Sequence, residues 1–296
     1  MNPLILTGHQ PTRAELKPHY QLCQLRWVGA LILDWNLIGL AFAAMSLTTN
    51  PVVWIVSLFV IGARQQALGW LAHDAVHHTA LENRRLADVV ANLLCFWPLG
   101  VDVHAFREFH FRHHKHLGTE LDPEEEHLPL PSVPCSKLAL FVRFVGHSLG
   151  GAALGTLRVS RLLQPETNAR KLGMALLHGL AIIATVIAEA PWIVPVWVLA
   201  QLTTLSAFFQ LRLLMEHTEV PGFTHRLVVG PIWRFFVHPH NSWAHDEHHR
   251  YPAAPSSRLE ALSQLTATGD ERTPLELVDR LIQSSARPAT RMEVAS

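Results

Sequence analysis

His110-Phe-Arg-His-His-Lys-His116 is the stretch from which the fold of this 296-residue chain can be inferred. In a helix, His110, His113 and His114 stand at i, i+3 and i+4, and they therefore share one face. Two further stretches repeat the theme, His73-Asp-Ala-Val-His77 upstream and His245-Asp-Glu-His248-His249 downstream. Three such histidine boxes, separated by apolar segments, predict a metal site assembled from distant parts of the chain.

The composition indicates a membrane protein. The chain is 49% hydrophobic and 16% charged, whereas soluble domains carry roughly 25% charged residues. Its formal net charge is zero, so no global basic field favours nucleic acid as a partner. The three cysteines form no Cys-x-x-Cys motif or disulfide framework, which suits a reducing compartment or a membrane environment.

Four apolar segments are long enough to cross a hydrocarbon core of about 30 Å as helices. They cover residues 27–48, 52–72, 172–189 and 191–213. Turns at 48–51 and 188–191 pair them into two antiparallel hairpins. The predicted fold is an all-α integral membrane protein, in which two transmembrane hairpins carry a cytosolic helical cap that holds the histidine boxes. The membrane domain is expected over 27–255, between a lead-in (1–26) and a polar tail (256–296).

Charge placement supports this topology. None of the 24 Lys and Arg residues lies in either hairpin turn, and nearly all lie before the first span, in 84–171 or after 225. Cytosolic segments of membrane proteins carry an excess of such residues. Both termini, the central segment and all three boxes are therefore expected on the cytosolic side, where the boxes can meet.

The boxes supply eight histidines on shared helical faces, too many for one tetrahedral zinc and suited to two metal ions. His217 directly follows the fourth span and is placed to be a ninth ligand. The predicted metal ligands are His73, His77, His110, His113, His114, His217, His245, His248 and His249. Neighbouring polar groups are expected to support these ligands through hydrogen bonds. The candidates are Asp74, His78, Asn241, Asp246 and Glu247.

Taken together, the boxes resemble those of the membrane fatty acid desaturase superfamily. The stretches His116-Leu-Gly-Thr-Glu-Leu-Asp-Pro123 and His248-His-Arg-Tyr-Pro252 resemble that family as well, and the likeness covers roughly residues 30–260. The resemblance implies two iron ions held by these histidines, O₂ as oxidant and a lipid acyl chain as substrate. It also implies electrons from a separate protein such as cytochrome b5 or a ferredoxin. Loss of two hydrogens would create a double bond.

Two alternatives stay open at this point. The same kind of di-iron centre could hydroxylate or ketolate a lipid or a carotenoid, and the extra His78 and His116 leave the reaction outcome open. A non-catalytic metal carrier is the other alternative. A carrier is expected to place its ligands within the spans, whereas these boxes lie at span ends.

Several polar residues outside the boxes also carry expectations. Asp34 and Arg64 lie within predicted spans and are expected to pair across the first hairpin or to contact a substrate headgroup, because lone charges are costly in lipid. His178 is expected to hydrogen-bond between helices. His238 is expected at the surface or in a loop, and Trp70 is assigned to an interfacial aromatic belt.

Overall fold

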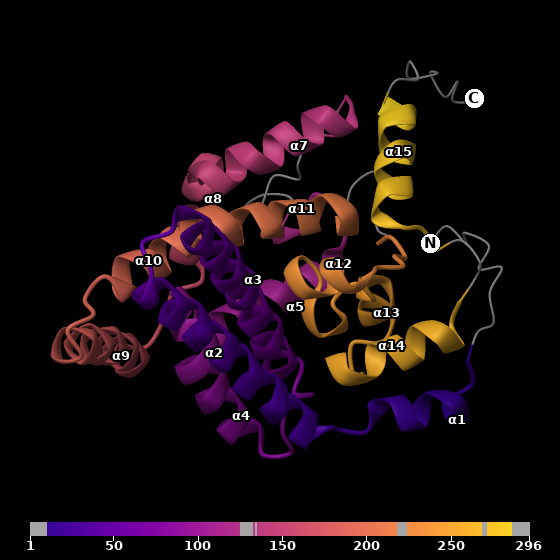
Figure 1. Ribbon diagram of the computed structural model, residues 1–296. Helices are drawn as coiled ribbons and strands as arrows, with labels where there is room; N and C mark the ends of the chain where they lie inside the picture. Colours follow the sequence, from indigo (N-terminus) through magenta and orange to yellow (C-terminus); the bar gives the residue numbers. More distant parts are fainter. Residues whose placement is uncertain (1–10, 125–132, 134, 218–223, 268–270, 286–296) are drawn as a thin grey trace.

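The computed structural model describes residues 11–124, 133, 135–217, 224–267 and 271–285. Within these residues the regular structure is helical, apart from an isolated bridge between Leu227 and Arg272. Figure 1 shows α12, α13 and α14 on one side of α3, with α9 and α10 on the other. The all-α prediction is confirmed.

Among the described residues, four helices are long and apolar enough to cross a membrane. They are α2 (Gln24–Leu47), α3 (Pro51–Val76), α9 (Asn168–Ile187) and a last span, Ile193–His217. The last span comprises α10 (Ile193–Ala200), the π-helical segment η5 (Gln201–Leu205) and α11 (Ser206–His217). The helices α3 and α11 run four residues beyond their predicted ends. The reason is that box one and His217 are themselves helical.

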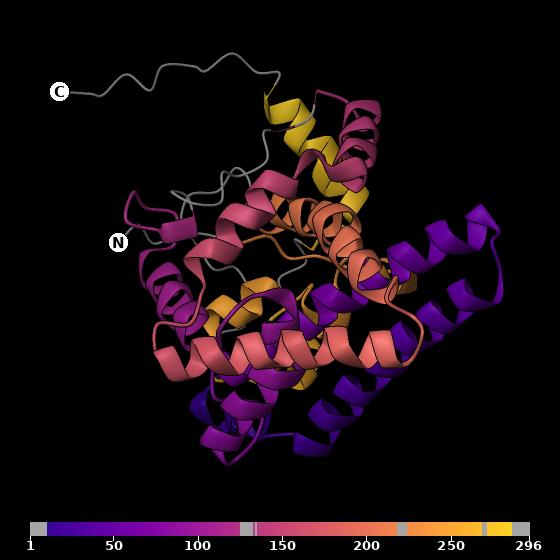
Figure 2. The ribbon, with the colours of Figure 1, turned by 90° about the vertical axis from the view of Figure 1, so that its left-hand side faces the viewer.

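The first hairpin packs α2 against α3 and projects beyond the other helices in Figure 2. Trp27, Leu31 and Ile38 of α2 are buried in one core with Leu68 and Leu71 of α3. The expected pair is present, with Arg64 Nη1 3.0 Å from Asp34 Oδ1 and both side chains buried. His240 Nε2 lies 2.7 Å from the second oxygen of Asp34. Buried charges persist when they are paired and hydrogen-bonded in this way.

The helix α3 and the segment η5 touch through their backbones. A Cβ added to Gly62 would lie 2.6 Å from the backbone nitrogen of Leu205, so only glycine fits at this crossing. The hydroxyl of Thr204 donates to the carbonyl of Leu58 at 2.8 Å. Single π-helical turns of this kind are frequent at functional sites. This contact places α11, which ends at His217, beside α3.

Two bent helix pairs fill the region between the hairpins. The first consists of α4 (Arg84–Ala91), η2 (Asn92–Phe96) and η3 (Trp97–Leu99), followed after an 86° bend by α5 (Val103–His116). The second consists of α7 (Lys137–Gly146) and η4 (His147–Gly151), followed after a 62° bend by α8 (Ala153–Leu162). The first bend directs α5, and with it box two, back toward the end of α3.

The C-terminal part adds five short helices around the end of α3. They are α12 (Pro231–Phe236), η6 (Pro239–Asn241), α13 (His245–Arg250), α14 (Ser256–Leu265) and α15 (Pro274–Ser285). The helix α15 starts at Pro274 behind a capping box, in which Thr273 and Glu276 exchange hydrogen bonds. Leu277, Val278 and Leu281 of α15 are fully buried in a core that also contains Trp70 and Leu214. The C-terminal helix therefore packs against the spans. At the other end of the described chain lie α1 (Arg13–Leu16) and η1 (Lys17–Tyr20).

Candidate metal centre

Four helices bring the predicted ligands to one place. Box one lies at the end of α3, with His77 capping that helix, and box two lies on α5. Box three is α13 itself, and His217 is the last residue of α11. Because each box is helical, its i, i+3 and i+4 positions direct their rings the same way. The structure brings all nine histidines together in two adjoining groups.

The first group contains five histidines from α3, α5 and α13. They are His73, His77, His110, His114 and His248, and their candidate ligand atoms all lie within 4.8 Å of one another. The Nε2 atom of His110 is 2.8 Å from that of His73 and 2.9 Å from that of His114. The Nε2 atom of His114 is also 3.0 Å from that of His248.

The second group contains the other four histidines. His113, His217 and His249 form one close set, and His217 and His245 form another with Glu216. The Nε2 atom of His245 is 3.0 Å from those of His217 and His249. The Nε2 atoms of His113 and His249 are 3.4 Å apart. Because His113 lies on α5 and His249 on α13, this contact joins box two to box three.

The donor chemistry of both groups fits metal ions. A neutral imidazole has one N–H, so several Nε2 atoms facing one another cannot all be satisfied by mutual hydrogen bonds. Nε2 of His77 is buried without a hydrogen-bond partner in the described chain. Burial lowers the pKa of His114 to about 4 and that of His248 well below its usual value. Both rings are thereby held in the neutral form that binds metals, and imidazole sites suit iron, copper and zinc.

An acidic turn after α5 supports box two. The Nδ1 atom of His113 lies 2.9 Å from Oδ1 of Asp122, and it lies 3.6 Å from Oε2 of Glu124. Burial lowers the pKa of His113, but the nearby carboxylates of Glu124, Asp122 and Glu216 together outweigh burial and raise it. Backbone N–H groups of Gly118 and Glu124 hold Asp122 in place. The sequence analysis assigned no role to Asp122 or Glu124, although the carboxylate beside a histidine box was a usable signal.

Two of the predicted supporting residues, Asp74 and Asn241, hydrogen-bond to Ser256 of α14. Asp74 accepts hydrogen bonds from the backbone and hydroxyl of Ser256, at 3.0 and 2.6 Å. The side-chain amide of Asn241 donates to the carbonyl of the same serine at 3.1 Å. These contacts tie the end of α3 and the segment before box three to the start of α14. They position the histidine-bearing segments relative to one another.

Box three is held from outside by an arginine. Asp246 and Glu247 lie 2.9 and 3.1 Å from the Arg226 guanidinium, and Glu247 also accepts from Thr266.

His78 adopts a left-handed backbone conformation (φ 60°) just after α3, where the chain turns away from the helix.

Two residues, Trp70 and His178, were placed wrongly by the sequence analysis, and His238 lies in a bend, as expected, but not at the surface. Trp70 is only 2% exposed and stacks on His73, with ring centroids 4.4 Å apart, because it precedes that histidine by one helical turn. His238 is fully buried, with its Nδ1 3.8 Å from Oε1 of Glu216. His178 lies 3.0 Å from the carbonyl of Met174 in its own helix.

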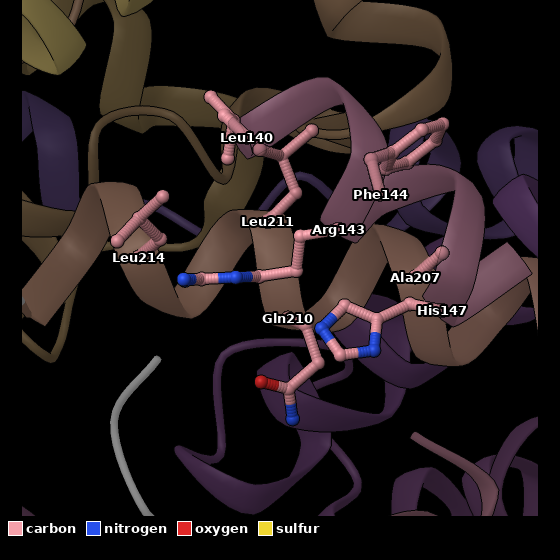
Figure 3. A pocket seen from close by; sticks show the side chains of 8 residues that line it. All are labelled: Leu140, Arg143, Phe144, His147, Ala207, Gln210, Leu211 and Leu214. Atoms are coloured by element: carbon pink, nitrogen blue, oxygen red, sulfur yellow. The ribbon is translucent and has the colours of Figure 1, made fainter. Parts of the chain in front are cut away.

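Two pockets of the described chain lie outside these groups. A small one of about 10 Å³ lies between α7 and α11, and Figure 3 shows the His147 ring beside Gln210 there, with the Arg143 guanidinium directed toward Leu214. It has room for little more than one water molecule. A larger pocket of about 340 Å³ is lined by Trp27, Asp74 and His240, among other residues. Neither pocket is lined by a box histidine.

The fold and the site define an integral membrane protein with a histidine-rich candidate metal centre at the ends of its spans. A model of the fatty acid desaturase family matches residues 49–275, and the chain belongs to that family.

Two characterised relatives are similar over shorter segments. A Delta(8)-fatty-acid desaturase of Euglena gracilis is 26% identical over 93 residues, which are 31% of this chain and 22% of the relative. A dihydrorhizobitoxine desaturase of Bradyrhizobium elkanii is 36% identical over 88 residues, which are 28% of this chain and 24% of the relative. The matched segments thus span less than a quarter of either relative.

Proposed function

We propose that the chain is a membrane lipid desaturase. It would bind two iron ions and use O₂, with electrons from a separate protein, to remove two hydrogens from an acyl chain. The observation that carries this proposal is the convergence of nine imidazoles from four separate helices at one end of the spans. Membership of the fatty acid desaturase family supports it.

The two groups of histidines suggest which residues hold each ion. The first ion would be held by the five-histidine group, and the second by His113, His217, His245 and His249. When bound, the iron pair supplies the oxidising power that an unactivated C–H bond requires. Asp122 accepts the Nδ1 proton of His113, which leaves Nε2 of that ring free for a metal.

The rest of the protein positions the substrate and excludes water. His110, His113, His245 and His248 are each buried, so bulk water is kept from the reacting centre. An acyl chain can approach from the bilayer, because the spans expose apolar side chains over much of their surface. We place the centre and both termini on the cytosolic side, following the distribution of Lys and Arg.

The names of the relatives support desaturation and leave the substrate open. Both are named desaturases, one for a fatty acid and one for dihydrorhizobitoxine. Positioning of the histidines at span ends, beside short helices, is the arrangement expected of an enzyme. A carrier needs its ligands near the midplane of the membrane.

The test is mass spectrometry of total lipids from a host with simple lipids. The host expresses the wild type, His113→Ala or the control His178→Ala, whose ring contacts the carbonyl of Met174. A lipid lacking two hydrogens is expected with the wild type and the control, and it should be absent with His113→Ala.

Two other results would replace the proposal. A product that has gained oxygen would assign hydroxylation or ketolation to the same centre. If the iron-loaded protein, supplied with O₂ and a reductant, changes no lipid but moves metal across vesicle membranes, the chain is a carrier.

A further inference from the structure

The nine histidines divide unequally, and one carboxylate lies where the smaller group is short of a donor. Five histidines form the first group and four form the second. Glu216 immediately precedes His217 on α11, and its side chain is 3% exposed. Its Oε2 atom lies 3.6 Å from Nε2 of His245. Among the described residues, it is the acidic side chain that falls within a candidate metal-binding group with these histidines, although Oε2 of Glu124 also lies 3.9 Å from Nε2 of His217.

The orientation of Glu216 is set by groups on the other side of its carboxylate. Nε of Arg212, one helical turn earlier on α11, is 2.6 Å from Oε1. Nδ1 of the fully buried His238 lies 3.8 Å from the same oxygen. The Arg212 guanidinium also lies over the ring of Trp70, 4.5 Å from its centroid. Oε1 is therefore occupied by its hydrogen bond from Arg212, and Oε2 is the oxygen directed toward His245.

The chemistry of the set favours a metal-bound carboxylate. Glu216, His217 and His245 together offer two imidazoles and one carboxylate, a donor combination typical of non-haem iron. Neutral imidazoles add no negative charge, and a buried cation is costly unless an anion compensates it. A carboxylate in direct contact provides that compensation.

We propose that Oε2 of Glu216 is a tenth metal donor, so that the second ion has four histidines and one carboxylate. The first ion has five histidines, which makes the two sites equal in donor number and unequal in charge. This inference rests on the proposed two-ion centre. Arg212 is a positioning residue in this arrangement, because it holds Oε1 and so directs Oε2.

The test counts metal ions in the full-length protein. Wild type, Glu216→Gln and the control Glu108→Gln are loaded anaerobically with ferrous iron in detergent and desalted, and their iron content is measured by mass spectrometry. Glu108 is exposed on α5 and provides the same change of charge away from the histidines. The wild type and Glu108→Gln are expected to retain two ions per chain. Glu216→Gln is expected to retain about one.

Mössbauer spectra of the same samples loaded with iron-57 identify the site that is lost. One of the two wild-type signals should disappear in Glu216→Gln. Two ions with wild-type signals in a monodisperse Glu216→Gln sample would overturn the inference. A wild type that binds no iron would instead overturn the proposed function.

A second measurement covers the case in which Glu216→Gln does not fold. In a cryo-EM structure of the iron-loaded wild type, Oε2 of Glu216 is expected about 2.0–2.2 Å from one ion, the usual length for carboxylate donors in such sites. A separation beyond hydrogen-bonding distance, roughly 3.2 Å, would show that Glu216 is not a ligand.

Discussion

The spans α3 and α9 are alike in sequence character and opposite in their surroundings. Their apolar 18-residue stretches have mean hydropathies of 1.4 and 1.5. In α3, however, 50% of that stretch is buried inside the protein, whereas in α9 only 6% is buried. The difference lies in polar residues. Arg64 and Gln66 of α3 reach Asp34 and the carbonyl of Val237, whereas His178 of α9 lies near a carbonyl of its own helix. Polar residues in a span therefore mark the face that other segments cover.

This contrast makes α3 the scaffold of the centre and α9 a membrane-facing helix. Gln65 donates to the carbonyl of Trp197 on α10, and Trp70 donates to the carbonyl of His240 on η6. The helix α3 thus gathers the second hairpin and the C-terminal segment around the histidines that it carries. Substitutions in α3 should affect both stability and activity, and matched substitutions in α9 should affect neither strongly.

The largest effect is expected when a ligand on the α3 side is removed. His77→Ala should lower the proposed desaturation about 100-fold or more, because loss of a ring from the five-histidine group should exceed the roughly 10–100-fold effect of losing an outer partner. The matched change His178→Ala in α9 should retain most activity. Product formation in purified, iron-loaded protein measures both. An equal loss of activity in the two variants would contradict the difference drawn between α3 and α9.

The second prediction concerns the buried ion pair. Arg64→Met leaves Asp34 fully buried without its arginine, and removal of one partner of such a pair costs roughly 3–5 kcal/mol. The double variant Asp34→Leu with Arg64→Met should recover much of that loss, since no lone charge remains. Thermal unfolding in detergent compares the variants. If Arg64→Met has the same melting temperature as the wild type, the polar face of α3 does not stabilise the hairpin.

The third prediction sharpens the comparison by testing a group outside either span. Asp122→Asn should weaken metal binding or activity by about 10–100-fold, because outer partners of ligating histidines tune them by that much. Asp74→Asn should chiefly lower the melting temperature, because Asp74 contacts Ser256 and Thr79. Iron titration and thermal unfolding of both variants separate the two roles. Unchanged iron affinity in Asp122→Asn would contradict its role at His113.

The smallest effect is expected from a matched pair of glycines. Gly62→Ala adds a methyl group against the backbone of η5 and should destabilise the protein by about 1–3 kcal/mol. Gly179→Ala on α9 meets no atom within 4 Å and should be neutral or stabilise by roughly 0.5–1 kcal/mol. Melting temperatures of the two variants test this. A neutral Gly62→Ala would mean that α3 and η5 can separate without cost.

The residues that sequence analysis missed show where local patterns end. Asp122 contacts His113 only because the turn at Gly118 (φ 66°) folds the chain back onto α5. His238 is buried because the segment after α12 brings it beside Glu216 of α11, far away in the sequence. Trp70 could have been recognised, because it stands one helical turn before His73. Its position near a span end favoured the interfacial assignment instead.

The sequence by itself determined the four spans, the helical faces of the boxes and the nine histidines that converge. Hydropathy and i, i+3, i+4 spacing are local properties, because they depend only on residues close together in the sequence and not on how the rest of the chain packs. Only the tertiary structure decided how the histidines divide into two groups and which carboxylates lie beside them. The 86° bend before α5 and the π-helical turn η5 set those distances. Distances between groups on different helices depend on such bends and on packing, which no local pattern specifies.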